Sequence, residues 1–507
     1  MADNLGRTKK FVYNSVAMAL QQVITMLTGL ILPRVMLICY GSEINGLVSS
    51  ISQFIAYFNL VEAGLSSATI YALYKPLADN DHKAISGVVV ASKRFYMQAG
   101  CIFTGLTAAL SVLYPLFIQS EVLSYYEIVV LVVILGFSGA LDFFTLSKYR
   151  TLLTADQKSY VLSLTSILST LIRTVVTIIL AVYGFGIVTV KFFALFSVFA
   201  RSAILLVYCK KNYTYINYKE KANTSALNKR WDALYLQILG SVQSGAPVVL
   251  LTLFLKDLKM VSVYSVFNMV MSGLDGVLGI FTSGLSASFG DVIARNETDT
   301  LKKTYKEFEY AYYILITIIY SITLATIMPF IRIYTANITD ANYDLPLVGF
   351  LFTLNGVFYC IKTPPGMIVI SAGMYKETRW RTTIQALILV IVGSVLTPFI
   401  GIYGVLVGSI CSNIYRDIDL LIFTPRRIVK TSVLHGFWRA LRVLIGIALV
   451  TIPFLLIPYE PTSLFTWVLY ACEVGIFAVV VVFILNTLFE KNEMIHVLKR
   501  LKSMVKR

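Results

Sequence analysis

The sequence predicts an all-α integral membrane protein with about 14 transmembrane helices. Two observations lead to this prediction. The 507 residues are 57% hydrophobic and only 14% charged, and their mean hydropathy is +0.76. The charged residues fall almost only in short clusters that separate long apolar stretches. A water-soluble domain could not bury so much apolar surface, whereas a lipid bilayer solvates it.

Each apolar stretch is long enough to cross a bilayer, which takes roughly 20 residues in a helix. The predicted spans are 11–38, 45–73, 95–118, 128–148, 160–183, 188–209, 232–255, 260–290, 308–334, 346–371, 382–401, 404–423, 441–458 and 466–489. They group into a first six-helix lobe (1–209), a cytoplasmic linker (210–231), a second six-helix lobe (232–424), a C-terminal helix pair (425–489) and a basic cytoplasmic tail (490–507). We expect the tail to lie as a helix on the membrane surface, because its apolar residues recur at helical spacing among lysines; the alternative is a frayed basic tail.

Basic residues indicate which connections face the cytoplasm. They concentrate in every second connection, in the segments 7–10, 75–94, 148–158, 210–230, 295–306, 376–381, 416–442 and 491–507. The other connections hold mainly acids, among them Glu43, Glu121, Asp257 and Glu460. By the positive-inside rule, both termini are predicted to be cytoplasmic. The net charge of +16 then reflects basic loops beside anionic headgroups, so nucleic acid is not an expected partner.

The connections argue against an enzyme. The longest polar one, from about 210 to 231, is too short for a soluble catalytic domain. We find no glycine-rich phosphate loop followed by Lys and Ser or Thr, which disfavours ATP-driven transport by this chain alone. His82, His435 and His496 all fall in predicted cytoplasmic segments, and the six cysteines are scattered. We therefore predict no catalytic residues, no metal site and no cofactor.

An internal repeat relates the two lobes. Residues 64–68 near the end of the second span match residues 284–288, residues 153–158 match 370–376, and the turn 183–186 matches 401–404. These matches lie at offsets of 217 to 220 residues and fall at equivalent points of a six-span pattern. Because six is an even number, the two copies are predicted to share one orientation in the membrane.

Two parallel six-helix lobes followed by a helix pair resemble the multidrug/oligosaccharidyl-lipid/polysaccharide (MOP) exporter superfamily. Within it, the chain looks most like the bacterial polysaccharide flippases of the Wzx type. The stretch from Lys362 to Thr378 is similar to that family's short cytoplasmic turn after the tenth span, and the outer turns 183–186 and 401–404 also resemble it. The resemblance implies a V-shaped, MATE-like pair of lobes around a cavity lined mainly by spans 1, 2, 7 and 8, with alternating access.

The resemblance also implies a cargo and a location. The cargo would be an undecaprenyl-diphosphate-linked oligosaccharide, moved from the inner to the outer leaflet for capsule, exopolysaccharide or O-antigen synthesis. The expected partners are this lipid-linked oligosaccharide and membrane lipids, with a polysaccharide polymerase and glycosyltransferases as further candidates. The expected location is the bacterial cytoplasmic (plasma) membrane.

Charged residues inside the predicted spans are the main functional candidates, because an ionised group at the bilayer centre costs at least about 2.5–3.5 kcal/mol. Arg173 lies near the middle of the fifth span, Lys362 lies in the tenth span before Pro364 and Pro365, and Arg34 lies near the outer end of the first. A lipid diphosphate needs cationic partners once water is removed. We therefore assign these three residues to substrate binding. The alternative is that they form internal ion pairs that only orient helices, or that Arg34 extends outward to water.

The acids and amides in the spans have two interpretations each. Glu62 and Asp275 either couple transport to an ion or balance the charge of the cavity bases. Amides within the expected cavity-lining spans either bind sugar or join neighbouring helices. We assign the following amides to the substrate: Gln21, Asn59, Gln237, Gln243 and Asn268. Lys191 and Arg201, towards opposite ends of the sixth span, are secondary candidates.

The leading functional prediction is a flippase for lipid-linked oligosaccharide. One alternative is a cation-coupled multidrug exporter of the same superfamily, which would favour acids rather than bases in its cavity. The other is a non-transporting scaffold of a polysaccharide assembly complex.

Overall fold

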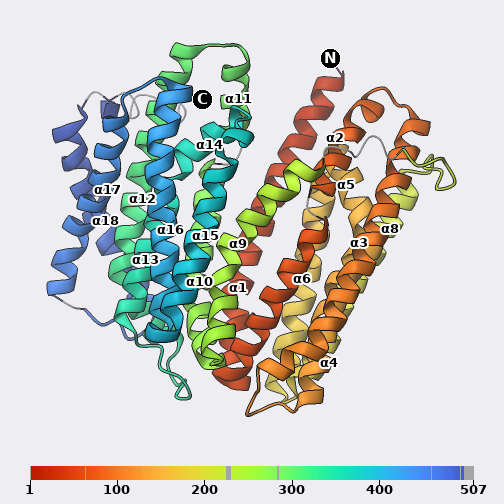
Figure 1. The fold of residues 1–507 in the computed structure, drawn as a ribbon, viewed down its shortest axis with the longest axis horizontal. Coiled ribbons are helices and arrows are strands. Elements are labelled where there is room, and N and C mark those ends of the chain that lie inside the picture. Colours follow the sequence, from red (N-terminus) through yellow and green to blue (C-terminus); the bar gives the residue numbers. More distant parts are fainter. Residues whose placement is uncertain are drawn as a thin grey trace. The chain divides into compact units, whose positions relative to one another are not determined.

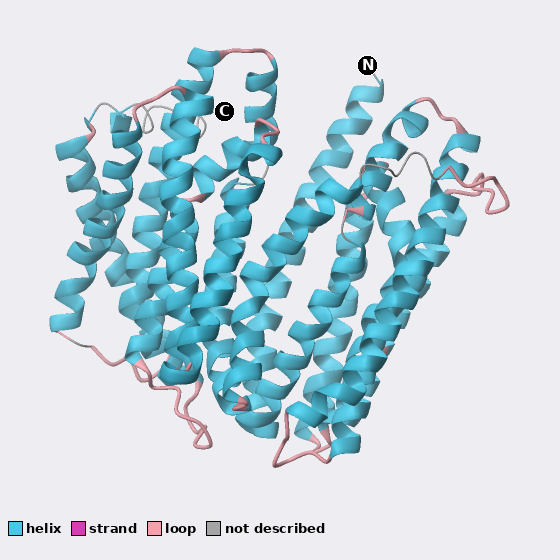
Figure 2. Ribbon diagram, viewed as in Figure 1, coloured by secondary structure: helices cyan, strands magenta, loops and turns pink. Residues whose placement is uncertain are grey.

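The computed structural model describes residues 2–62, 64–223, 230–282, 285–457, 459–491 and 493–495. In these ranges all regular structure is helical, which confirms the predicted all-α class (Figure 2). The helices labelled in Figure 1, with the shorter elements between them, are α1 (Ala2–Phe58), η1 (Asn59–Glu62), α2 (Leu65–Ala78), α3 (His82–Phe117), α4 (Tyr125–Leu141), η2 (Asp142–Leu146), α5 (Ser147–Ala155), α6 (Ser159–Val182), α7 (Ile187–Ala194), α8 (Phe196–Asn212), α9 (Arg230–Leu255), α10 (Leu258–Thr282), α11 (Leu285–Ala294), α12 (Thr298–Tyr334), α13 (Pro346–Ile361), α14 (Thr363–Ser371), α15 (Tyr375–Ile400), α16 (Ile402–Thr424), η4 (Pro425–Val429), α17 (Val433–Leu456) and α18 (Leu464–Phe489). The tail helix expected within 490–507 falls mostly outside the described residues, as does Gly284 of the repeat.

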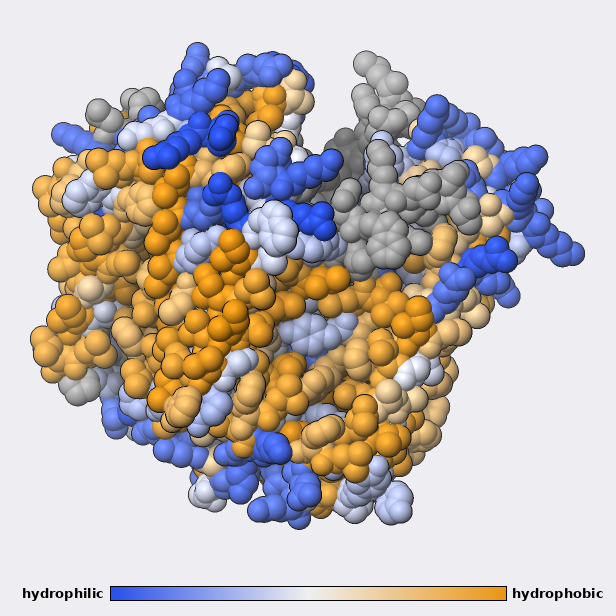
Figure 3. All heavy atoms as spheres, in the orientation of Figure 1, coloured by the Kyte–Doolittle hydropathy of each residue, from blue (hydrophilic) through white to orange (hydrophobic). Residues whose placement is uncertain are grey.

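The chain divides into two compact units, Met1–Ser265 (unit 1) and Val266–Arg507 (unit 2). The boundary falls within α10, later in the chain than the expected linker at 210–231. On the face shown in Figure 3, hydrophobic residues occupy the middle of each unit and hydrophilic residues gather at its ends. This is the distribution that a membrane imposes on a bundle of spanning helices.

The described residues contain twelve helical stretches that are long and apolar enough to cross a membrane. The first of them, Val12–Ala78, has 67 residues and is long enough for two crossings. The helix α16 is not among the twelve because it carries three charged residues, Arg416, Asp417 and Asp419. All three are buried in the protein. These two features together account for the difference from the predicted number of about 14.

A single glycine makes the turn between the first two predicted spans. Gly41 has φ 78° and ψ 176°, and it interrupts what is otherwise the continuous helix α1. Figure 1 shows that α1 turns back on itself. A residue with a side chain would be strained at this positive φ. The connection expected between residues 38 and 45 is therefore reduced to a kink at one residue.

Two of the predicted spans are broken. The second span stops at Phe58, continues as the short helix η1 and resumes as α2 after Gly64. The tenth span breaks between α13 and α14, at Lys362. Pro364 and Pro365 stand in the first turn of α14, where a helix needs no backbone N–H. The predicted interruption of this span by its prolines is confirmed.

The connections of unit 1 gather at two opposite ends. At the basic end, Asp156 accepts hydrogen bonds from Lys158 at 2.7 Å, Tyr213 at 2.6 Å and Lys10 at 3.3 Å, which joins three separate segments. At the other end, Glu43 accepts a hydrogen bond from the backbone N–H of Glu121 at 2.7 Å, and Tyr40 donates one to the carbonyl of Phe185. This grouping agrees with the alternation of loops predicted from charge.

Candidate functional site

Unit 1 contains a cavity of about 250 Å³ inside its own helical bundle. Four parts of the unit enclose it: α1, α4, α6 and the α7–α8 segment. Arg173 enters the cavity from α6 and Lys191 from α7. The other lining residues are Leu32, Met36, Val48, Ser52, Ile134, Leu135, Ser138, Thr177, Ala194, Leu195 and Val198. The cavity is thus an apolar chamber with three hydroxyl groups and two cations.

Neither cation of this cavity is neutralised by a carboxylate in the described part of the chain. No carboxylate of the described residues interacts electrostatically with Arg173, and the charge that acts on Lys191 is that of Arg173 itself. The lining includes no Asp or Glu. Two like charges therefore face each other in an apolar setting, which is an unfavourable arrangement unless an anion joins them.

In unit 2, Lys362 lies at the break between α13 and α14. Its ammonium donates a hydrogen bond to Oδ1 of Asn413 at 2.6 Å and lies 4.5 Å from the ring centroid of Tyr359. Asn413 in turn donates to Oδ1 of Asn355 at 2.9 Å. Lys362 is therefore held in place by neutral groups from α13 and α16, through a hydrogen bond and a cation–π contact.

Two carboxylates act on Lys362 from longer range. Asp417 of α16 is 5% exposed, and among the described residues neither of its oxygens has a hydrogen-bond partner. Asp275 of α10 is exposed and also interacts electrostatically with Lys362. The structure thus brings Lys362 and Asp275, both named from the sequence, into one electrostatic cluster. Asp417, which the sequence analysis did not single out, is its third member.

Glu62 is bound to a base at the edge of unit 1. It forms a salt bridge with Arg150 of α5, and both side chains are half-buried. Arg150 stands in a segment that the charge pattern assigned to the cytoplasmic side. Glu62 therefore has a partner other than Arg173, and this ion pair joins η1 to α5.

The remaining candidates are spread over several helices. Arg34 is half-buried in α1, between Leu32 and Met36, which line the cavity of unit 1. Gln243 of α9 has a buried Nε2 with no hydrogen-bond partner among the described residues. Asn59 and Gln237 are exposed, whereas Gln21 and Asn268 are half-buried. Of these amides, Asn268 belongs to unit 2 and the others to unit 1.

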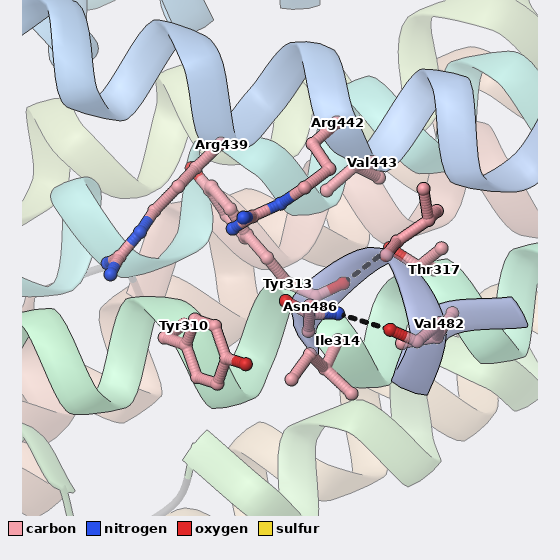
Figure 4. A pocket seen from close by; sticks show the side chains of 10 residues that line it. Tyr310, Tyr313, Ile314, Thr317, Arg439, Arg442, Val443, Val482 and Asn486 are labelled. Atoms are coloured by element: carbon pink, nitrogen blue, oxygen red, sulfur yellow. Dashed lines mark hydrogen bonds between the residues drawn. The ribbon is translucent and has the colours of Figure 1, made fainter. Parts of the chain in front are cut away.

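A second charged cluster in unit 2 joins the last two helices to α12. Arg439 is 1% exposed and binds Glu309 at 2.9 Å and Glu490 at 3.0 Å, while Arg442 binds Glu490 at 2.6 Å. Figure 4 shows both arginines on one helix, near Tyr310 of α12 and Asn486 of α18. The sequence analysis placed both arginines in a cytoplasmic connection, but the helix α17 begins at Val433 and includes them. Because every charge here has an opposite partner, we interpret the cluster as structural.

Sequence reasoning underrated one residue and missed two. Lys191 was a secondary candidate, yet it lies in the same cavity as Arg173. Asn413 and Asp417 were not singled out: Asn413 is an uncharged residue in the middle of the predicted span 404–423, and Asp417 lies beside Arg416, which was assigned to a basic connection. Their signal is the spacing, since 413 and 417 are four residues apart and so share one face of a helix.

No protein-family model matches the sequence, and no curated protein matches it significantly. Solved structures do match. A multidrug resistance MATE family transporter of the MOP superfamily, in an inward-facing conformation, has 14% identity and a TM-score of 0.66, covering 86% of this chain and 99% of its own. The lipid II flippase MurJ, in an inward closed conformation, has 16% identity and a TM-score of 0.67, covering 95% and 100%.

A third match is a MOP superfamily transporter from Pyrococcus furiosus, whose binding pocket is described as having reverse polarity. It has 15% identity and a TM-score of 0.53, and covers 84% of this chain and 97% of its own. At these identities the likeness is one of fold, and it extends over nearly the whole length of each protein. The chain is therefore a multi-pass membrane protein with the fold of the MOP superfamily transporters.

Proposed function

We propose that this protein is a flippase that moves an undecaprenyl-diphosphate-linked oligosaccharide from the inner to the outer leaflet of the bacterial cytoplasmic membrane. The cargo would serve the synthesis of a surface polysaccharide. Arg173 and Lys362 bind the diphosphate group at different stages of transport, and the amides of the spans bind sugar. Asp275 balances the charge of Lys362 between transport cycles.

One observation supports this proposal above the others. The membrane cations Arg173 and Lys362 have no salt bridge with any described residue. A cation that only orients helices would be paired, because an unpaired charge in the membrane is costly. No described carboxylate acts on Arg173, and the two that act on Lys362 do so only from longer range. Cations without a close carboxylate favour an anionic cargo, whereas a pump for cationic drugs needs acids in the corresponding place.

The membrane potential is a sufficient source of energy for such a cargo. An anion that moves outward follows an inside-negative potential, which contributes about 2.3 kcal/mol per charge at 100 mV. Flipping of a diphosphate therefore requires no ATP, provided that the protein's own cations stay in place.

The proposal is tested by replacing the two cations in cells that make the polysaccharide. We expect Arg173→Ala and Lys362→Ala to abolish surface polysaccharide while the protein still accumulates in the membrane. Lys210→Ala, which removes an exposed charge at the end of α8, is the matched control and should export normally. Normal export by both membrane variants would remove these residues from the substrate path.

The same cells distinguish the flippase from a multidrug exporter. Deletion of the gene should eliminate the surface glycan and leave sensitivity to cationic dyes unchanged. Higher sensitivity to the dyes with an intact glycan layer would identify an exporter instead.

A further inference from the structure

We infer that the cavity inside unit 1 is a two-cation site for a diphosphate group, in which Arg173 and Lys191 each bind one of the two phosphates. This inference rests on the proposed function for the identity of the cargo, but not for the existence of the site. It adds Lys191 as a binding residue and locates the site within one unit of the protein.

The composition of the cavity defines the class of its ligand. Its polar groups are two cations and the hydroxyls of Ser52, Ser138 and Thr177, and its lining holds no acid. Such a set binds anions, because guanidinium and ammonium groups donate charge-assisted hydrogen bonds and the hydroxyls can donate more. A metal ion or a cationic drug would meet only repulsion.

The presence of two neighbouring cations indicates how many anionic groups the ligand carries. Arg173 and Lys191 repel each other, and no carboxylate among the described residues lines the cavity between them. A single phosphate satisfies one of them well, whereas a diphosphate presents separate anionic groups to both. The volume of about 250 Å³ is several times the roughly 30 Å³ of a water molecule, which leaves room for a diphosphate.

The apolar walls strengthen the attraction between the cations and an anion. Leu32, Met36, Val48 and Ile134 line the same chamber and exclude water from the charged groups. Binding in such a setting is strong, since the electrostatic attraction is screened less than in water. A lipid-attached diphosphate and a free one share this chemistry, so the test must separate them.

The experiment measures binding to the purified full-length protein in detergent by isothermal titration calorimetry. The probes are inorganic pyrophosphate, inorganic phosphate and farnesyl diphosphate. We expect both diphosphates to bind more tightly than phosphate, and Arg173→Gln and Lys191→Gln each to weaken them roughly tenfold to a hundredfold. Tighter binding of farnesyl diphosphate than of pyrophosphate would identify a lipid-attached ligand, and the reverse a free one. Lys210→Gln, an equal loss of charge outside the cavity, should bind as the parent protein does.

Thermal melting separates a binding role from a structural one. Because neither cation has a partner among the described residues, its neutralisation leaves no buried acid unpaired. The variants should therefore melt at the same temperature as the parent protein or higher, and a given concentration of pyrophosphate should stabilise the parent more than either variant. Equal affinity for phosphate and pyrophosphate, or unchanged binding by both variants, would overturn the inference. Binding without transport would instead contradict the proposed function and leave the site intact.

Discussion

At the scale of single residues, Asp156 shows how one carboxylate joins distant segments. It binds Lys10, Lys158 and Tyr213, and so connects the start of α1, the turn before α6 and the segment after α8. Burial would raise the pKa of Asp156, but the hydrogen bonds from Lys158 and Tyr213 and the charges of Lys158 and Lys10 lower it overall. The ionised form is therefore the one that stabilises the fold.

Asp156→Asn should lower the melting temperature of the purified protein. The free energy of unfolding should fall by about 1–3 kcal/mol, because the neutral amide cannot accept the same charge-assisted hydrogen bonds. A carboxyl group with a lowered pKa stabilises the folded state above its ordinary pKa, and this contribution is lost as the pH falls through the pKa of the folded state. The free energies of unfolding of the parent and the variant should thus differ by a constant amount from neutral pH down to about 5. They should converge below about pH 4.

Asp79→Asn is the matched control for this measurement, because Asp79 is an exposed acid in the same unit. It should melt as the parent protein does at every pH. A difference between Asp156→Asn and the parent that grows as the pH falls would contradict the assignment.

At the scale of helices, close contact between backbones holds α1 against the start of α10. A Cβ atom on Gly46 would overlap the backbone carbonyl oxygen of Leu258. Beside this contact, Asn45 donates a hydrogen bond to the hydroxyl of Ser262 at 2.7 Å. Farther along α1, Ser50 accepts one from Thr252 of α9 at 2.9 Å. Unit 1 therefore includes α9 because small and hydroxyl residues allow this approach.

Gly46→Ala should destabilise the protein by about 1–3 kcal/mol, since the added methyl group meets backbone rather than a movable side chain. Gly29→Ala, in the same helix, has nothing within 4 Å of its Cβ and is the control. It should leave the melting temperature unchanged or raise it, because alanine favours a helix by about 1 kcal/mol over glycine. Equal melting temperatures for the two variants would show that the contact at Gly46 is loose.

At the scale of the whole molecule, the apolar stretches predicted the helices well, because a bilayer requires them to be long and uninterrupted by charge. Each of the two matched turns contains a glycine with positive φ, Gly184 at 79° and Gly401 at 63°, although the two glycines are one residue out of register in the alignment of 183–186 with 401–404. Helix ends were predicted less well. The helix α3 begins at His82, well before the expected residue 95, because Asp81 caps it outside the apolar region.

The site was predictable in its residue types but not in its groupings. Hydropathy alone locates the spans, and Arg173 and Lys362 then stand out because charged residues are rare within them. The partnership of Arg173 with Lys191, and of Glu62 with Arg150, depends on how helices pack, and one sequence carries no record of those contacts. The burial of Arg439 with Glu309 was hidden for the same reason.

Reconstitution tests the central claim most directly. Purified protein is placed in liposomes that contain a labelled undecaprenyl-diphosphate-linked oligosaccharide, and a membrane-impermeant glycan-modifying enzyme reports the leaflet in which the label lies. We predict that the parent protein exchanges the label between leaflets, and that Arg173→Gln and Lys362→Gln slow this exchange by about tenfold or more. Exchange no faster than in protein-free liposomes, or equal rates for the parent and both variants, would contradict the account.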